Sequence, residues 1–257
     1  MEWRGVDDYG QMSQLGAERL HQAIVEGIRG GRRFNLGLAT GNTMVELYRL
    51  LAGKLNQSQA DLGKLHTYNL DEYVGGDMLA VPESHPLSYR RYMKANFFGR
   101  LDPKLGFKED QAHFPDPSEP WRFDGDLALA GGLDFQLLGI GFNGHIAFNE
   151  PIDGKEISVE AFAALPSRVI ALEELTIQTN SRLTAGDDAA LVPRHAVTMG
   201  MKQILAAREI LLLACFPEQA ELLGKMRRGK PTPELPASYL LVHPNASIIY
   251  TSDKIKL

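Results

Sequence analysis

The sequence predicts an α/β fold, a three-layer α/β/α sandwich around a mainly parallel, Rossmann-like sheet. Short apolar runs alternate with amphipathic stretches along the 257 residues, of which 44% are hydrophobic. Strands that alternate with helices imply right-handed crossovers and a sheet covered on both faces. A chain of this length can bury one large core. We therefore expect a single domain over residues 1–257.

The first half of the chain follows this alternation closely. Residues 11–30 have the spacing of an amphipathic helix that stops at Gly30 and Gly31. An apolar strand at 34–39 follows, and residues 40–43 open a second helix. The pattern then predicts a strand at 65–70, a helix at 84–98, a short helix at 124–130 and a strand at 133–140.

The second half is less regular. It contains candidate strands at 169–172, 209–214 and 247–251, with helices near 200–207 and 217–228. Residues 101–122 are rich in Pro, Asp and Lys, which is typical of a surface excursion. Residues 152–190 hold few long periodic runs, and we expect a mobile lid within them because they follow the histidine loop described below.

Composition excludes several classes of protein. The net charge of −5 argues against a nucleic-acid surface, which would need a basic face, although a few local donors could still bind one anionic group. The single cysteine, Cys215, rules out an intrachain disulfide and fits a reducing compartment. No segment approaches the roughly 20 apolar residues of a membrane span. We expect a cytoplasmic protein with neither membrane nor nucleic-acid partners.

The most informative stretch is GIGFNGHIAFNEP at residues 139–151. It follows an apolar strand, and ligands bind at the carboxyl ends of strands in open α/β sheets. Glycines allow close approach of the backbone, and His145 has a carboxylate, Glu150, five residues away. Such a pair can hold the imidazole in one tautomer for acid–base chemistry. Taken alone, the histidine could equally cap a helix at a tight turn.

Two further strand ends carry polar residues. Residues 40–43, TGNT, precede a helix, so their amides, hydroxyls and helix dipole form a candidate anion site, with Thr43 alternatively a simple N-cap. Asp71 and Glu72 end the strand at 65–70, where a carboxylate can reach into a cleft or cap the next helix. Alternation along the strand directs Glu72 to the face opposite Asp71. The seven histidines show no paired spacing, so we expect no metal site.

Three ordered motifs resemble those of the glucosamine-6-phosphate deaminase (isomerase) family. They are LGLATGNT at 36–43, NLDEYVG at 69–75 and the 139–151 loop, and the resemblance extends to HPNASI at 243–248. It implies an aldose–ketose isomerase that also deaminates. The expected substrate is an amino-hexose 6-phosphate, foremost glucosamine 6-phosphate, which yields fructose 6-phosphate and ammonia. No cofactor is implied, and a homo-oligomer is left open.

The same resemblance assigns roles to individual residues. His145 is expected to open the sugar ring, oriented by Glu150 and Asn143. Asp71 is expected to move a proton between C2 and C1, with Glu72 supporting it from behind. The phosphate would be bound by Thr40, Gly41, Asn42, Thr43 and Arg182.

One position departs from the family pattern. Gln219 stands where relatives carry a phosphate-binding lysine, and Lys225 and Lys202 are the candidate substitutes. We expect the turn and Arg182 to bind the phosphate with partial help from a relocated lysine. A pocket short of positive charge would then gain affinity from a lysine at position 219.

Three alternative functions are weighed against this interpretation. Galactosamine 6-phosphate is a close rival substrate, because no motif reports the configuration at C4. A 6-phosphogluconolactonase has a related histidine loop, but this chain lacks the D-E-R element expected there. A non-catalytic sugar-phosphate sensor would not need a proton-transfer base such as Asp71.

Overall fold

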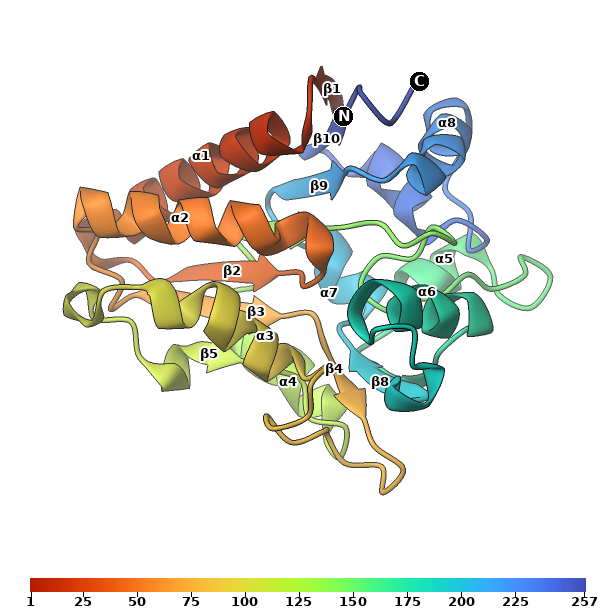
Figure 1. Ribbon diagram of the computed structural model, residues 1–257, viewed down its shortest axis with the longest axis horizontal. Coiled ribbons are helices and arrows are strands. Elements are labelled where there is room, and N and C mark those ends of the chain that lie inside the picture. The colour runs from red at the N-terminus through yellow and green to blue at the C-terminus, as the bar shows by residue number, and fades with distance from the viewer.

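The computed structural model describes residues 1–257 and is built around a seven-stranded sheet in which all neighbouring strands are parallel (Figure 1). The strand order is β1-β10-β9-β6-β2-β3-β5. The predicted α/β class with a mainly parallel sheet is thus confirmed. The strands are β1 (Glu2–Val6), β2 (Phe34–Leu38), β3 (Leu65–Asn69), β5 (Ala112–His113), β6 (Phe135–Leu138), β9 (Ile210–Ala214) and β10 (Ala246–Thr251).

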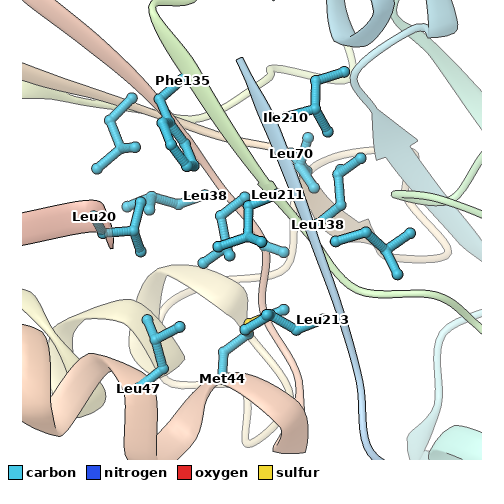
Figure 2. Packing of buried hydrophobic residues seen from close by; sticks show 14 of the residues in the cluster. Leu20, Leu38, Met44, Leu47, Leu70, Phe135, Leu138, Ile210, Leu211 and Leu213 are labelled. Carbon is cyan, nitrogen blue, oxygen red and sulfur yellow. The ribbon is translucent and has the colours of Figure 1, made fainter. Parts of the chain in front are cut away.

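Helices cover both faces of this sheet. Leu38 of β2 belongs to the main core cluster together with Leu20 of α1 (Tyr9–Ile28) and Leu47 of α2 (Val45–Ser58) (Figure 2). On the opposite face, Tyr68 of β3 meets Phe123 of α4 (Pro120–Leu129) edge-on, with 5.8 Å between ring centroids. The alternation of side chains along each strand thus separates two apolar layers.

A second, smaller sheet lies beside the first. It consists of β4 (Asp71–Val74), β8 (His195–Thr198) and β7 (Arg168–Ala171), paired antiparallel in the order β4-β8-β7. Its side chains pack into an apolar cluster of nine buried residues, which is distinct from the main core. Ile177 of α6 (Glu174–Thr184) belongs to this smaller cluster, so α6 packs with the small sheet.

The remaining helices are short. They are α3 (Tyr89–Asn96), α5 (Val159–Ala163), α7 (Met201–Leu205) and α8 (Ala220–Arg228). Single turns of 3-10 helix occur at η1 (Arg29–Gly31), η2 (Asn42–Met44), η3 (Phe98–Arg100), η4 (Pro103–Leu105), η5 (Glu109–Gln111), η6 (Ala189–Leu191) and η7 (Pro217–Gln219), and a longer one at η8 (Pro236–Val242). None of the helices combines the length and apolar composition that a membrane span requires.

The strand predicted at 65–70 differs from the structure at its end. Strand β3 ends at Asn69, and Asp71 begins β4 in the small sheet. Leu70 lies between them, donating its N–H to the Leu38 carbonyl and accepting from the N–H of Met199. The prediction that Asp71 ends the second strand is therefore wrong, because the chain passes from one sheet to the other without a loop.

Candidate active site

A pocket opens at the carboxyl ends of β9, β6, β2 and β3, which are neighbours in the sheet. Figure 1 shows the arrowheads of β2 and β3 pointing toward the side where α6 lies. Glu72, Glu150 and Arg182 do not line the pocket. Of the residues expected from the sequence, it is lined by Thr40, Gly41, Asn42, Thr43, Asp71, Asn143 and His145.

The histidine and its two expected partners form one hydrogen-bonded group. Nδ1 of His145 lies 3.1 Å from Oε2 of Glu150, and the same oxygen accepts from Nδ2 of Asn143 at 2.7 Å. Oδ1 of Asn143 accepts from the backbone N–H of His145 at 3.2 Å. A carboxylate beside Nδ1 keeps the proton on that nitrogen, which leaves Nε2 free to take up another.

The Glu150 carboxylate is buried and yet remains acidic. Burial alone would raise its pKa, but the hydrogen bonds and charge of His145 and the hydrogen bond from Asn143 hold the pKa below its usual value. Glu150 is therefore ionised near neutral pH. Its negative charge lies against Nδ1 of the His145 ring.

A close approach at Gly141 and the hydrogen bonds of Asn149 hold the histidine loop in this geometry. A Cβ at Gly141 would lie 2.3 Å from Cε1 and Nε2 of His145, so the imidazole packs directly on the glycine backbone. Asn149 has no exposed surface, and its Nδ2 donates to the carbonyls of Ile146 (3.1 Å) and Met199 (2.9 Å). Asn149 thus ties the loop to the residue that follows β8, a structural role that the motif alone did not indicate.

Asp71 and Glu72 lie on opposite faces, as alternation predicted. Asp71 lines the pocket, and burial together with the neighbouring Glu72 carboxylate raises its pKa well above the usual range. Glu72 has no exposed surface and accepts hydrogen bonds from Ser88 Oγ and from the backbone N–H groups of Tyr73, Tyr89 and Arg90. Burial raises the pKa of Glu72, and these four donors oppose that effect. Glu72 therefore fixes the start of α3 next to Asp71.

The turn at residues 40–43 is held from outside, which leaves its inner side to the pocket. Gly41 has a φ of +108°, a conformation that favours glycine, and its carbonyl accepts from the hydroxyl of Tyr92 at 2.7 Å. The Asn42 carbonyl accepts from the hydroxyl of Tyr9 at 3.0 Å. Neither η2 nor α2 has a side-chain N-cap bond, so the alternative role of Thr43 as a cap is wrong.

The pocket contains no lining lysine or arginine. Arg182 lies at its rim, with Cζ 6.0 Å from the ring centroid of Phe142, a lining residue, and its Nη2 pairs with Oε1 of Glu218 at 3.2 Å. Lys225 pairs with Glu221 at 2.7 Å on the exposed side of α8, and Lys202 lies on α7. Neither lysine lines the pocket, so neither replaces the missing cation at the wall.

Gln219 does line the pocket, but its side chain is engaged in the fold. Oε1 accepts from the backbone N–H groups of Cys215 and Phe216, both at 2.9 Å, and Nε2 donates to the Ile140 carbonyl at 2.7 Å. These bonds join the loops after β9 and β6. The glutamine thus stabilises the pocket wall at the position where relatives are expected to carry a charge.

Sequence reasoning did not single out several lining residues. Tyr89 lies within the HPLSYRRYM segment that follows the second motif, and its place at the start of α3 could have marked it. Asn180 adjoins the NSR element, and its Nδ2 donates to the Tyr73 hydroxyl at 2.8 Å. The structure groups no three His, Cys, Asp or Glu side chains as metal ligands.

Comparison with known proteins shows the family of this chain. Residues 7–148 match the family described as glucosamine-6-phosphate isomerases/6-phosphogluconolactonase. The chain belongs to this family. Among its relatives, the glucosamine-6-phosphate deaminase of Lysinibacillus sphaericus is 36% identical over 256 residues, which cover 97% of this chain and 98% of that protein. The glucosamine-6-phosphate deaminase of Rhodopirellula baltica is 40% identical over 232 residues, covering 88% and 85% of the two chains.

Solved structures of family members share the whole fold. A monomeric glucosamine-6-phosphate deaminase matches with a TM-score of 0.86 at 31% identity, over 99% of this chain and 98% of that one. The 6-phosphogluconolactonase of Trypanosoma brucei matches with a TM-score of 0.71 at 18% identity, over 98% and 96% of the two chains. At that identity the second match concerns the fold alone.

The close approach at Gly141 leads to the first prediction. A Gly141→Ala variant should displace the His145 imidazole from Glu150 and reduce turnover by roughly 10²-fold, as misplacement of a reacting group by about 1 Å can do. Gly139→Ala is the matched control, because a Cβ there would meet only Met44 Cε, at an ordinary 3.6 Å. The measurement is kcat for both variants. Equal activities would contradict the packing argument.

The bonds of Gln219 reverse the expectation for a lysine at that position. Gln219→Lys removes the acceptor of two buried N–H groups, each costing about 1–3 kcal/mol when unsatisfied. The variant should unfold at a lower temperature without gaining affinity for a sugar phosphate. Gln22→Lys, on the exposed side of α1, controls for the added charge. Normal thermal stability together with tighter binding would show that the wall tolerates the lysine.

Proposed function

We propose that this protein converts glucosamine 6-phosphate and water into fructose 6-phosphate and ammonia. The observation that carries this proposal is that Asp71 and His145 line one pocket at the carboxyl edge of the sheet, and that Glu150 is hydrogen-bonded to His145 outside the lining. The names of the most similar relatives support the choice of substrate. The decisive experiment is ammonia release measured across a panel of amino-hexose 6-phosphates, with galactosamine 6-phosphate as the test of C4 preference.

In this proposal His145 opens the pyranose ring. Its Nε2 takes the proton of the anomeric hydroxyl and delivers one to the ring oxygen, which gives the open-chain aldehyde. During this exchange the imidazole passes through a cationic form, which the ionised Glu150 stabilises. Asn143 orients the pair through its hydrogen bonds to Glu150 and to the His145 backbone.

Asp71 then acts on the open chain. Its carboxylate removes the proton at C2 and returns one to C1, while the amine nitrogen loses a proton and O1 gains one, so the aldose becomes a ketose imine. Water adds to C2 of the imine and ammonia leaves, which balances the reaction. The raised pKa makes Asp71 a stronger base than an ordinary aspartate. A stronger base removes a proton from carbon more readily.

The turn at residues 40–43 and Arg182 bind the phosphate in this scheme, and α6 acts as a lid within residues 152–190 of a single domain. Two contacts support the lid. Nδ2 of Asn42 donates to the Leu183 carbonyl at 3.2 Å, and Asn180 bonds Tyr73. A phosphate oxygen or a sugar hydroxyl in the pocket could replace one partner in each of these two hydrogen bonds. The apolar residues of α6 do not belong to the main core cluster. A shift of α6 therefore leaves the packing of the main core intact.

Removing the proposed base should abolish isomerisation. We predict that Asp71→Asn lowers kcat by roughly 10²–10⁴-fold with little change in sugar-phosphate binding, because an amide cannot accept the C2 proton. Asp61→Asn, an exposed aspartate in the loop before β3, is the control. In the unmodified protein, kcat/KM should fall as pH falls through the raised pKa of Asp71, because the protonated carboxyl cannot accept the C2 proton. This fall should therefore occur at a pH above the pKa of about 3.9 that is typical of aspartate. Near-normal turnover by Asp71→Asn would remove Asp71 from the mechanism.

The separate roles of Glu150 and Asn143 beside His145 can be tested by comparing two variants. Glu150→Gln should lower kcat more than Asn143→Ala, because only Glu150 supplies a charge to the imidazolium. Both substitutions break the Asn143–Glu150 bond or weaken it, so each controls for the lost contact in the other. The comparison is made on the cyclic substrate, where ring opening contributes to the rate. A larger loss in Asn143→Ala would assign the main role to orientation.

A further inference from the structure

Beside the pocket, an ion pair joins α6 to the turn that follows β9, and no step of the proposed reaction uses it. Arg182 extends from α6 and pairs with Glu218 of η7, the turn that follows β9. The two side chains are 56% and 43% exposed, so solvent reaches both. An ion pair in that environment exchanges partners readily.

The Arg182–Glu218 pair matters because the pocket lining carries no positive charge of its own. No cation lines the pocket, Gln219 is committed to three hydrogen bonds within the wall, and Lys225 is paired with Glu221. A sugar phosphate carries close to two negative charges at neutral pH. Arg182, beside the lining residue Phe142, is placed to meet that charge, and in this structure its guanidinium is held by a carboxylate.

We propose that Glu218 is an affinity-determining residue that competes with the substrate phosphate for Arg182. This inference rests on the proposed function, because it requires a phosphorylated ligand at this end of the pocket. The phosphate displaces the Glu218 carboxylate, since a guanidinium binds phosphate in a bidentate manner and the phosphate offers more acceptor oxygens. Phosphate binding therefore breaks the bridge between α6 and η7.

This exchange has two consequences for the protein. Glu218 weakens substrate binding, because each binding event must first separate an existing pair. It also holds the Arg182 guanidinium near Phe142 while no substrate is bound. A neutral glutamine at 218 would keep the shape of the side chain and remove the competing charge.

The test is a split between KM and kcat. In Glu218→Gln, KM for glucosamine 6-phosphate should fall about two- to fivefold, the range expected when an exposed ion pair no longer competes for its partner. The kcat should change little, because Glu218 does not touch the reacting carbons. Glu221→Gln is the matched control: it breaks the exposed pair with Lys225 on the neighbouring helix α8 and should leave KM unchanged.

A second substitution identifies the partner. In an Arg182→Gln background, Glu218→Gln should no longer lower KM. Three results for KM would overturn the proposal: an unchanged or raised KM in Glu218→Gln, an equal fall in KM in Glu221→Gln, or a fall in KM that Glu218→Gln still causes in the Arg182→Gln background. A fall in kcat with constant KM would also overturn it.

A binding measurement tests the competition independently of the proposed reaction. Glucose 6-phosphate, which has no amine to release, is titrated calorimetrically into the unmodified protein and into Glu218→Gln. Tighter binding by the variant supports the competition even if the unmodified protein releases no ammonia from glucosamine 6-phosphate, a result that would reject the proposed function alone. Equal affinities overturn the competition whatever the outcome of the ammonia assay.

Discussion

The two sheets of this protein are joined through the backbone of Leu70, and the position of the candidate site depends on that joint. Its N–H bonds to Leu38 in the central sheet, and its carbonyl accepts from Met199 beside the small sheet. The next two side chains must then point to opposite faces, so Asp71 enters the pocket and Glu72 reaches the start of α3. One backbone crossing thereby sets the place of the proposed base and of its support.

Three buried carboxylates around the pocket have different surroundings and therefore different properties. Asp71 is buried next to a like charge, which raises its pKa. Glu150 receives donors from His145 and Asn143, which lower its pKa. Glu72 is saturated by four donors and serves the fold. Groups of one chemical type thus become a proposed base, an ionised partner and a structural anchor through burial and hydrogen bonding alone.

The sequence predicted most strands of the central sheet well and missed its two edge strands, β1 and β5. Strands β2, β6 and β9 were placed within two residues, because strands buried on both faces are rich in apolar residues. Strand β1, with the half-exposed sequence EWRGV, and the two-residue β5 carry no such signal and exist through pairing with β10 and β3. The helix α6 escaped prediction because its apolar side packs on the small sheet, which the sequence did not indicate.

The sequence by itself determined the histidine group, because His145, Asn143, Glu150 and the glycine beneath the imidazole lie within one loop and interact locally. Only the tertiary structure decided the partners of Gln219 and Arg182. Gln219 bonds to Ile140, 79 positions away, and Arg182 pairs with Glu218, 36 positions away. A motif records which residues are neighbours along the chain, whereas the partners of a charged or amide side chain are set by which strand ends the fold brings together.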